Sequence, residues 1–405
     1  MPPLVTSWQR RLFPVLLAAF TAQLGVPAFM PFIPLYMAEL GISDVGEAAR
    51  WSGVLLAITP LTSTLSVPYL GLLGDRIGLK PMALIGLGLG GFTIAALALA
   101  TSPWHLLIGR MLFGFCGVYW TFFAAAIAEH APREDMVRAF GWLQMVNFGA
   151  LIVAPAMGGA VASVLGLKAA FVMAGVVFWV ATAIVAFWYP STEQLTSKRT
   201  ETGNGSPWQM IFAQPQMAML SLLLLVSFYA EGSTLPIIPL YLQHLDVAPD
   251  QVAVIVGLIT ALSAATYVAA NAFIGRVVPT RLAHIAVLPG LIGGAIVCVP
   301  LFFASQLWHL LVFRPLLSLF TGTIPALVYT AAEPFVPPER RGAGFGLLTS
   351  VGLGGTAAGR VASGLVASLS LSGVFLVDGI LLLGGFGLYS AFRRRFPYPD
   401  VDRER

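Results

Sequence analysis

The chain has 405 residues, of which 58% are hydrophobic and only 10% are charged, whereas a soluble protein carries about 25% charged residues. This composition excludes an ordinary soluble protein and indicates a chain embedded in lipid. The net charge is +4, and basic residues at the ends of apolar segments explain it without a nucleic acid partner.

Twelve apolar runs follow one another along the chain, and each is near the roughly 20 residues that a helix needs to cross a bilayer core of about 30 Å. They predict an all-α membrane protein with twelve transmembrane helices. The first run is too long for the apolar core of a cleavable signal peptide, so we expect it to remain as a span. The predicted spans are residues 12–40, 51–70, 82–101, 105–128, 139–165, 169–189, 217–243, 251–274, 283–304, 309–331, 343–367 and 373–392.

Basic residues favour one orientation of these spans. Short cytoplasmic loops retain Lys and Arg, and most of the 22 Lys and Arg residues lie in the two tails or in every second loop. We therefore expect both termini in the cytoplasm and a multi-pass protein in the inner membrane of a bacterium. Cys116 and Cys298 lie inside predicted spans, so neither a disulfide framework nor a metal site is expected.

The chain repeats itself at a constant spacing of 204 or 205 positions. The repeated stretches are FMPFIPLYMAEL and TLPIIPLYLQHL (29–40 and 234–245), PWHLLIGR and LWHLLVFR (103–110 and 307–314), and AFVMAG and VFLVDG (170–175 and 374–379). Trp, His, Arg, Pro and Tyr are scarce in apolar helices, so a duplication is favoured over chance matching. Because each copy has an even number of spans, the two bundles are expected to be parallel and pseudo-symmetric.

The duplication divides the chain into four parts. We expect a six-helix bundle at residues 1–189, a flexible cytoplasmic linker at 190–216, a second six-helix bundle at 217–392 and a cytoplasmic tail at 393–405. The linker is predicted from its Ser, Thr and Gly content. No loop can hold a soluble catalytic domain and no H-E-x-x-H motif is present, so we expect no enzyme.

The repeated proline motif lies at the outer ends of the first and seventh spans. Each proline removes a backbone donor and bends the helix. Tyr36 and Tyr241 are expected among the lipid headgroups, where Tyr is enriched. We interpret these two helix ends as the places where the halves would meet to close an outer gate.

The stretch GLLGDRIGLKP (71–81) resembles the loop signature of the major facilitator superfamily, although Leu79 replaces a basic residue. The second-half counterpart, GRVVPTR (275–281), has no acid. The resemblance implies twelve spans and a conformational latch, in which Asp75 would lie against the N-terminus of the eleventh span. The latch residues are Gly71, Asp75, Arg76, Gly78, Lys80 and Arg341. The alternative is that Asp75 and Arg76 form an ordinary solvated pair.

The stretch GALIVAPAMGG (149–159) resembles the glycine-rich helix of antiporters in this superfamily, with Ala154 where Gly is expected. The matching residues are Gly149, Pro155, Gly158 and Gly159. Small residues allow close helix packing and Pro bends the helix, so a packing face without bearing on transport direction is the alternative. WSGVLLAITPL (51–61) also looks like the drug:proton antiporter branch, which implies export.

Five ionisable residues lie within predicted spans, where a charge costs about 2.5–3.5 kcal/mol near the centre and marks a pathway or a buried pair. The candidates for proton coupling are Glu231, Asp378, Arg110, Arg314 and Arg360. The chain has no G-x-x-x-x-G-K-[ST] motif, so we expect a proton gradient, without ATP or another cofactor, to drive the protein.

Glu231 is the preferred proton carrier because it lies near the middle of the seventh span, beside Gly232 and before Pro236, where the helix can break. Loss of water disfavours a charged carboxylate, so such an acid can take up and release a proton. The alternative is a static salt bridge to Arg314 or Arg360. Asp378 lies nearer the outer edge and ranks second.

Two further arginines complete this set. Arg110 matches an Arg that the resemblance ties to proton handling, and Arg314 is its counterpart in the repeat, which argues partly for a structural role. Arg360 occupies the place of Pro155 in the repeat.

Aromatic and amide side chains at mid-depth of the spans are candidates for a substrate cavity. Such a surface suits bulky amphipathic molecules, because aromatic faces bind loosely and amides donate or accept hydrogen bonds. The candidates are Gln23, Tyr119, Trp120, Gln144, Asn147, Tyr229, Tyr267, Asn271 and Phe320.

These features favour a proton-coupled antiporter that exports drug-like or amphipathic small molecules by alternating access. Its expected partners are the substrate, protons and the lipid bilayer, without nucleic acid, and we expect a monomer. Two alternatives stay open: a proton-coupled symporter or facilitator for a sugar or another small metabolite, and a non-transporting membrane sensor.

Overall fold

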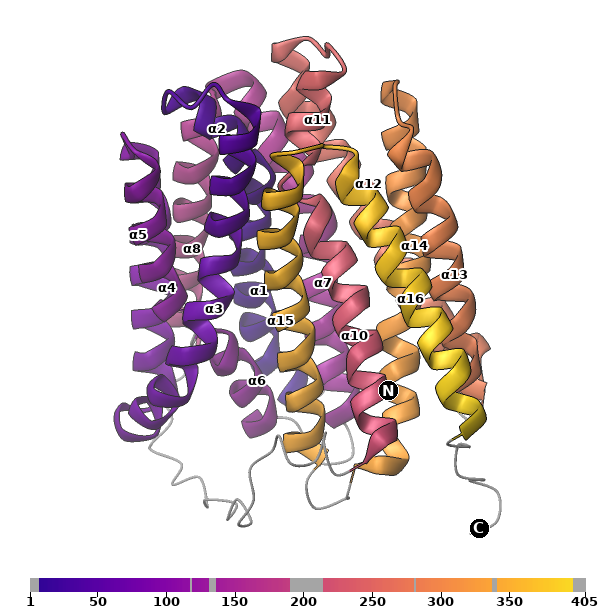
Figure 1. Ribbon diagram of the computed structural model, residues 1–405. Coiled ribbons are helices and arrows are strands. Elements are labelled where there is room, and N and C mark those ends of the chain that lie inside the picture. Colours follow the sequence, from indigo (N-terminus) through magenta and orange to yellow (C-terminus); the bar gives the residue numbers. More distant parts are fainter. Residues whose placement is uncertain are drawn as a thin grey trace, which may run out of the picture. The chain divides into compact units, whose positions relative to one another are not determined.

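The computed structural model describes residues 7–116, 119–130, 136–189, 214–279, 282–336 and 341–395 (Figure 1). Within these ranges the chain is helical and has no strand, and each predicted span falls on helix. By length and apolar character, nine helices in the described part could cross a membrane. The prediction of an all-α membrane protein is confirmed.

Residues up to Trp188 form helices of the first half of the sequence. These are α1 (Ser7–Phe29), η1 (Met30–Phe32), α2 (Ile33–Glu39), α3 (Val45–Ile77), α4 (Leu79–Ala96), η2 (Leu97–Leu99), α5 (Pro103–Phe115), α6 (Tyr119–His130), α7 (Met136–Leu165) and α8 (Leu167–Trp188). The second half contributes α10 (Pro215–Thr234), α11 (Ile238–His244), α12 (Pro249–Val277), α13 (Ala283–Phe302), α14 (Leu307–Ala332), η6 (Glu333–Phe335), α15 (Arg341–Ala367) and α16 (Gly373–Arg395).

The helices pack into two compact units that interleave along the chain. Unit 1 holds the described residues of Met1–Gly41, Ile58–Arg199 and Pro249–Ala261, and unit 2 those of Ile42–Ala57, Thr200–Ala248 and Leu262–Arg405. The first part of α3 thus packs with second-half helices, and the first part of α12 with first-half helices. The bundle bounds derived from the duplication stay a prediction, and most of the predicted linker and tail lies outside the described residues.

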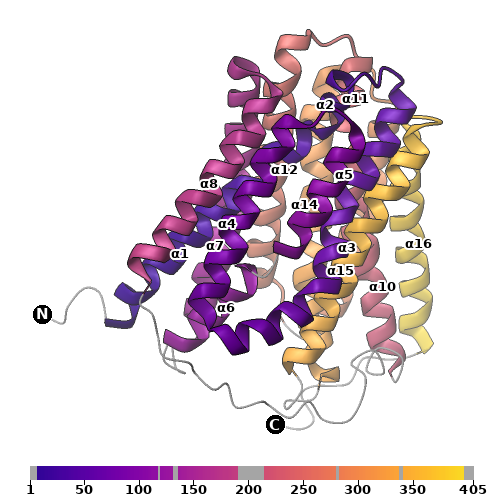
Figure 2. The ribbon, with the colours of Figure 1, turned by 90° about the vertical axis from the view of Figure 1, so that its left-hand side faces the viewer.

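Neighbouring helices within each unit come from distant parts of the sequence. In unit 1, α4 lies beside α8 (Figures 1 and 2). In unit 2, α10 lies beside α15, and α13 packs against both α14 and α16. Side chains from α10, α14 and α16 can therefore meet inside unit 2.

Prolines break the two helices that carry the repeated motif. α1 ends at Phe29 and α10 ends at Thr234, and in each case a short second helix follows. Proline nitrogens cannot donate the hydrogen bonds that would continue the helix. The predicted bends are therefore real breaks.

The repeated tyrosines are buried, so their expected place among lipid headgroups is wrong. Tyr36 is 0% and Tyr241 is 3% exposed. The Tyr241 hydroxyl donates to the carbonyl oxygen of Ala304 at 2.8 Å, and the Tyr36 hydroxyl lies 3.3 Å from the carbonyl oxygens of Ala98 and Ala100. Each tyrosine thus supplies a donor to a helix end, where carbonyl groups lack helical partners.

A single residue joins α3 to α4, which corrects the expectation of an interhelical loop at residues 71–81. Residues up to Ile77 belong to α3, and α4 begins at Leu79. Gly78 between them has φ +93° and ψ 159°, a conformation that is open essentially to glycine alone. The glycine expected to make a tight turn does so.

Candidate functional site: a buried ion-pair network in unit 2

A buried ion pair connects α10 to α14. Arg314 Nη2 lies 2.9 Å from Glu231 Oε2, and the two side chains are 6% and 20% exposed. Both of its members lie in the described part of the chain. Glu231 and Arg314, both predicted to couple protons, thus form the salt bridge that was the alternative interpretation of Glu231.

Hydroxyl groups surround both members of the pair. Thr321 Oγ1 and Ser318 Oγ donate to the Glu231 carboxylate, the second at 3.1 Å to Oε1. Arg314 donates from Nη1 to Ser318 Oγ and from Nε to Thr234 Oγ1, the latter at 2.9 Å. Charge-assisted hydrogen bonds of this kind are stronger than neutral ones, so both charges are well compensated.

Asp378 is a second acid in the same cluster. It projects from α16, is 0% exposed, and lies beside Ser233 of α10, with 2.7 Å between Ser233 Oγ and Asp378 Oδ2. It lies within electrostatic range of Arg314 and Glu231, although it forms no ion pair among the described residues. Two carboxyl groups and one guanidinium therefore share one buried network.

Arg110 has a different environment from its repeat counterpart, Arg314. It is 1% exposed, and its guanidinium carbon lies 5.6 Å from the centre of the Phe29 ring, a distance suited to a cation–π contact. Phe29 occupies the repeat position of Thr234, which binds Arg314. The duplication therefore places an aromatic ring where the second half has a hydroxyl group.

The other polar partners also lack counterparts in the first half. At the spacing of 204 or 205 positions, Glu231, Ser233, Thr234, Ser318 and Asp378 correspond to Val26, Ala28, Phe29, Gly114 and Ala174. The same helical framework forms in the first half without these polar groups. Architecture alone does not explain their presence in the second half.

Arg360 lies elsewhere, between α15 and α3. Its Nη1 donates to the carbonyl oxygen of Leu56 at 2.8 Å. In a helix this carbonyl would accept from the residue four positions on, but that residue is Pro60, which has no N–H. Arg360 thus supplies a hydrogen bond that the proline removes, and among the described residues no ion pair joins it to Glu231.

The antiporter-like stretch of α7 is a close helix-packing face. A Cβ on Gly159 would lie 2.8 Å from the carbonyl oxygen of Ala253, and one on Gly158 would overlap the backbone of Ala28. Gly149 is less confined, since its nearest neighbour would be Phe20 at 3.7 Å. Helix α7 continues through Pro155.

Most of the predicted latch has no described side chains. The side chains of Asp75, Arg76 and Arg341 and the surroundings of Gly71 lie outside the described part. Lys80 Nζ donates to the carbonyl oxygen of Tyr189 at 2.6 Å, which joins α4 to the end of α8. The latch stays a prediction.

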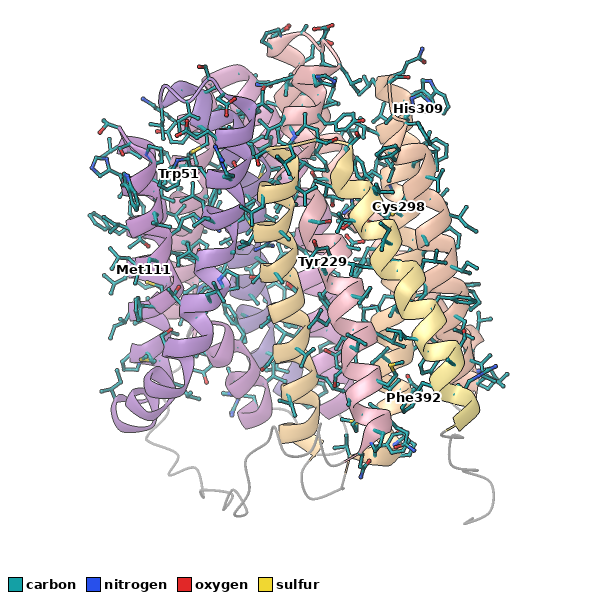
Figure 3. The ribbon with its side chains drawn as sticks, viewed as in Figure 1. Trp51, Met111, Tyr229, Cys298, His309 and Phe392 are labelled. Carbon is teal, nitrogen blue, oxygen red and sulfur yellow. The ribbon has the colours of Figure 1, made fainter. Side chains whose placement is uncertain are left out.

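The substrate-cavity candidates are divided between the two units and stay predictions. In unit 1, Gln23 donates to Asn147, and the Tyr119 ring packs 5.3 Å from that of Phe178. In unit 2, a Cβ on Gly359 would meet the backbone of Tyr229, one on Gly322 that of Tyr267, and one on Gly293 the ring of Phe320. Tyr229 is labelled on α10 in Figure 3. Asn271 is half-buried, and the side chains of Trp120 and Gln144 are not described.

The sequence interpretation missed the hydroxyl residues of the network. Ser233, Thr234, Ser318 and Thr321 are common residue types that carry no motif. Aligning the two halves would have found most of them, because small or apolar residues occupy the matching positions in the first half.

Comparison with known proteins identifies the family. The family profile described as Major Facilitator Superfamily matches residues 15–281 and 220–405. The chain belongs to the major facilitator superfamily. It is therefore a multi-pass membrane protein of a transporter family, as the loop signature and the duplicated spans led us to expect.

Two relatives of the chain carry drug-related names. The chain is 28% identical over 398 residues to the multidrug resistance protein MdtG of Dickeya zeae, with 96% of each chain covered. It is 27% identical over 343 residues to a multi-drug resistance efflux pump PmrA homolog of Lactococcus lactis, with 82% of each covered.

Two solved structures share the fold at low sequence identity. The nucleoside transporter NupG matches with a TM-score of 0.74 at 13% identity, over 94% of this chain and 98% of that one. A bacterial homolog of the human lysosomal transporter Spinster matches with a TM-score of 0.73 at 14% identity, over 95% and 97%. These likenesses support the fold alone.

Proposed function

We propose that the chain is a proton-coupled antiporter that exports drug-like or amphipathic small molecules by alternating access. The names of the relatives and the antiporter-like stretch of α7 support export of such compounds. The buried pair of Glu231 and Arg314 carries the proposal of proton coupling, because its polar partners occur in only one of two otherwise similar halves. The proposal includes a bacterial inner membrane, both termini in the cytoplasm, a monomer, and no cofactor beyond the proton gradient.

A proton on Glu231 would remove the charge that holds Arg314 Nη2. The network then loses its main link between α10 and α14 beside Thr234, where α10 ends. Protonation would thereby change the packing of a helix end that is already broken. One charge moving through 100 mV supplies about 2.3 kcal/mol, and about 1.4 kcal/mol corresponds to a tenfold ratio, so one proton per cycle could hold a substrate gradient of roughly tens-fold.

The test is drug-induced proton release from everted membrane vesicles, followed with a pH-sensitive dye. The wild type should exchange protons for a lipophilic compound offered as the substrate. Glu231→Gln should reduce this exchange at least about tenfold while substrate binding remains, because Gln cannot carry the proton. Glu231→Asp should keep partial exchange.

Glu39→Gln serves as the matched control, because Glu39 is an exposed acid at the end of α2. It should exchange protons like the wild type. Full exchange by a folded Glu231→Gln variant would contradict the role of Glu231. Accumulation of substrate inside intact cells would contradict the antiporter proposal and favour the symporter.

A further inference from the structure

The hydroxyl group of Ser233 lies between two oxygen atoms. Ser233 Oγ is 2.7 Å from Asp378 Oδ2 and 3.0 Å from the carbonyl oxygen of Ala230. A serine hydroxyl has one proton to donate, and a carbonyl oxygen can only accept. If Ser233 donates to Ala230, the short contact to Asp378 requires a proton on the carboxyl group.

The opposite assignment leaves one contact without a proton. If Ser233 donates to an ionised Asp378, its oxygen faces the carbonyl oxygen of Ala230 with no hydrogen between them. Both contacts are full two-centre hydrogen bonds when Asp378 Oδ2–H donates to Ser233 and Ser233 donates to Ala230. The geometry therefore favours a neutral Asp378.

The charges around Asp378 lead to the same assignment. The titratable groups that face it are Glu231 and Tyr229 on α10, Arg314 on α14 and Cys298 on α13, the last labelled beside α16 in Figure 3. In the described part of this cluster the one cation is Arg314, and it is paired with Glu231. On neighbouring α15, Arg360 binds Leu56.

The two acids also differ in the donors that they receive. The Glu231 carboxylate accepts from Arg314, Ser318 and Thr321. Asp378 Oδ1, which is fully buried, has no hydrogen-bond partner in the described part of the chain. A buried carboxylate with a bare oxygen is unfavourable, whereas a neutral carboxyl group tolerates it better.

We propose that Asp378 bears the proton of this network while Glu231 is ionised, and that the proton passes between the two acids during transport. The step breaks the O–H bond at Asp378 and forms one at a Glu231 oxygen. Arg314 stays protonated and moves its hydrogen bonds from Glu231 to the newly ionised Asp378. This assignment adds detail to the proposed function. It rests on that function for the claim that the proton drives transport.

Infrared spectroscopy of the protein in lipid vesicles tests the assignment directly. Spectra at neutral pH in H₂O and D₂O should contain a carboxylic-acid C=O band that shifts on deuteration. The band should disappear in Asp378→Asn and remain in Glu231→Asp, which keeps a carboxylate opposite Arg314. In Ser233→Ala it should move to higher frequency, because the acid loses its hydrogen-bond acceptor.

Asp378→Ala is a second variant in case Asn disturbs folding, because Ala174 holds the matching position in the first half. It should also lack the band. A wild-type spectrum without a deuteration-sensitive acid band, or a band kept in both Asp378 variants, would overturn the proposal.

Failure of this test and failure of the proposed function are distinguishable, because the spectra require no transport. Without the Asp378 band, proton-coupled export through Glu231 can still be measured in vesicles. If the band is present but the vesicles release no protons, proton-coupled export fails and the protonation of Asp378 stands.

Discussion

Arg110 and Arg314 occupy the same position in the two copies of the repeat but have different neighbours. Arg110 faces the ring of Phe29, whereas Arg314 contacts the Glu231 carboxylate and two hydroxyl groups of the network. Both are buried, so burial of the arginine belongs to the common framework. The ionisable chemistry is determined by the neighbouring residues, and these differ between the copies.

Gly78 gives a prediction at the scale of one residue. Gly78→Ala should lower the free energy of unfolding by about 1–3 kcal/mol, because a Cβ is strained at this positive φ. Thermal unfolding in mild detergent measures the loss. Gly384→Ala on α16 is the control, because a Cβ there would have no neighbour within 4 Å and the φ is not positive, and it should not lower stability. Equal midpoints for Gly78→Ala and the wild type would contradict the prediction.

Two helix crossings are equivalent in the two units. In unit 2, Gly364 of α15 crosses α3, and a Cβ on it would lie 2.6 Å from the carbonyl oxygen of Ala49. In unit 1, Gly159 of α7 crosses α12 with the corresponding distance of 2.8 Å to Ala253. Small residues allow this close approach. The crossing of α3 and α15 differs in one respect, since Arg360 stands where α7 has Pro155.

Arg360 and Pro60 give a prediction at the scale of the helix pair. In Pro60→Ala the Leu56 carbonyl regains a helical N–H donor, so the hydrogen bond from Arg360 becomes partly redundant. Arg360→Met should therefore lower the free energy of unfolding less in the Pro60→Ala background than in the wild type, and the difference should be about 1–2 kcal/mol. Unfolding free energies of the four proteins in mixed micelles give this coupling energy.

Arg314→Met provides the comparison for this cycle. Arg314 is a buried arginine that binds Glu231, whereas Arg360 is half-buried and binds Leu56. The loss of unfolding free energy in Arg314→Met should add to the change in Pro60→Ala, with no coupling energy between the two substitutions. Equal coupling energies for the two arginines would show that Arg360 does not compensate for the proline.

The whole molecule is a duplicated framework with chemistry concentrated in one copy. The repeated tyrosines, the buried arginines and the glycine crossings recur in both halves. The acids and hydroxyl groups of the network occur in the second half. A transporter built this way can keep two similar structural halves while only one of them carries the proposed proton.

Membrane orientation gives a prediction for the whole chain. A green fluorescent protein fused to the C-terminus should fluoresce, and alkaline phosphatase inserted after Gly166 should be active, because the first site is expected in the cytoplasm and the second outside. Fluorescence and phosphatase activity of intact cells measure the two locations. Active phosphatase at the C-terminus would reverse the orientation.

The sequence by itself determined the class of fold, the twelve spans and the duplication. These features depend on the length of apolar runs and on a constant spacing, which can be read along the chain without knowing any contact. It also singled out Glu231, Arg314 and Asp378, because ionisable residues are rare within apolar spans.

Only the tertiary structure decided which of these residues meet. Glu231 and Arg314 are 83 positions apart, Ser233 and Asp378 are 145 apart, and Arg360 and Leu56 are 304 apart. Packing of α10, α14 and α16 brings the first two pairs together, and the crossing of α15 with α3 brings the third. The burial of Tyr36 and Tyr241 has the same origin, because their hydroxyl groups bind helix ends that lie far away in sequence.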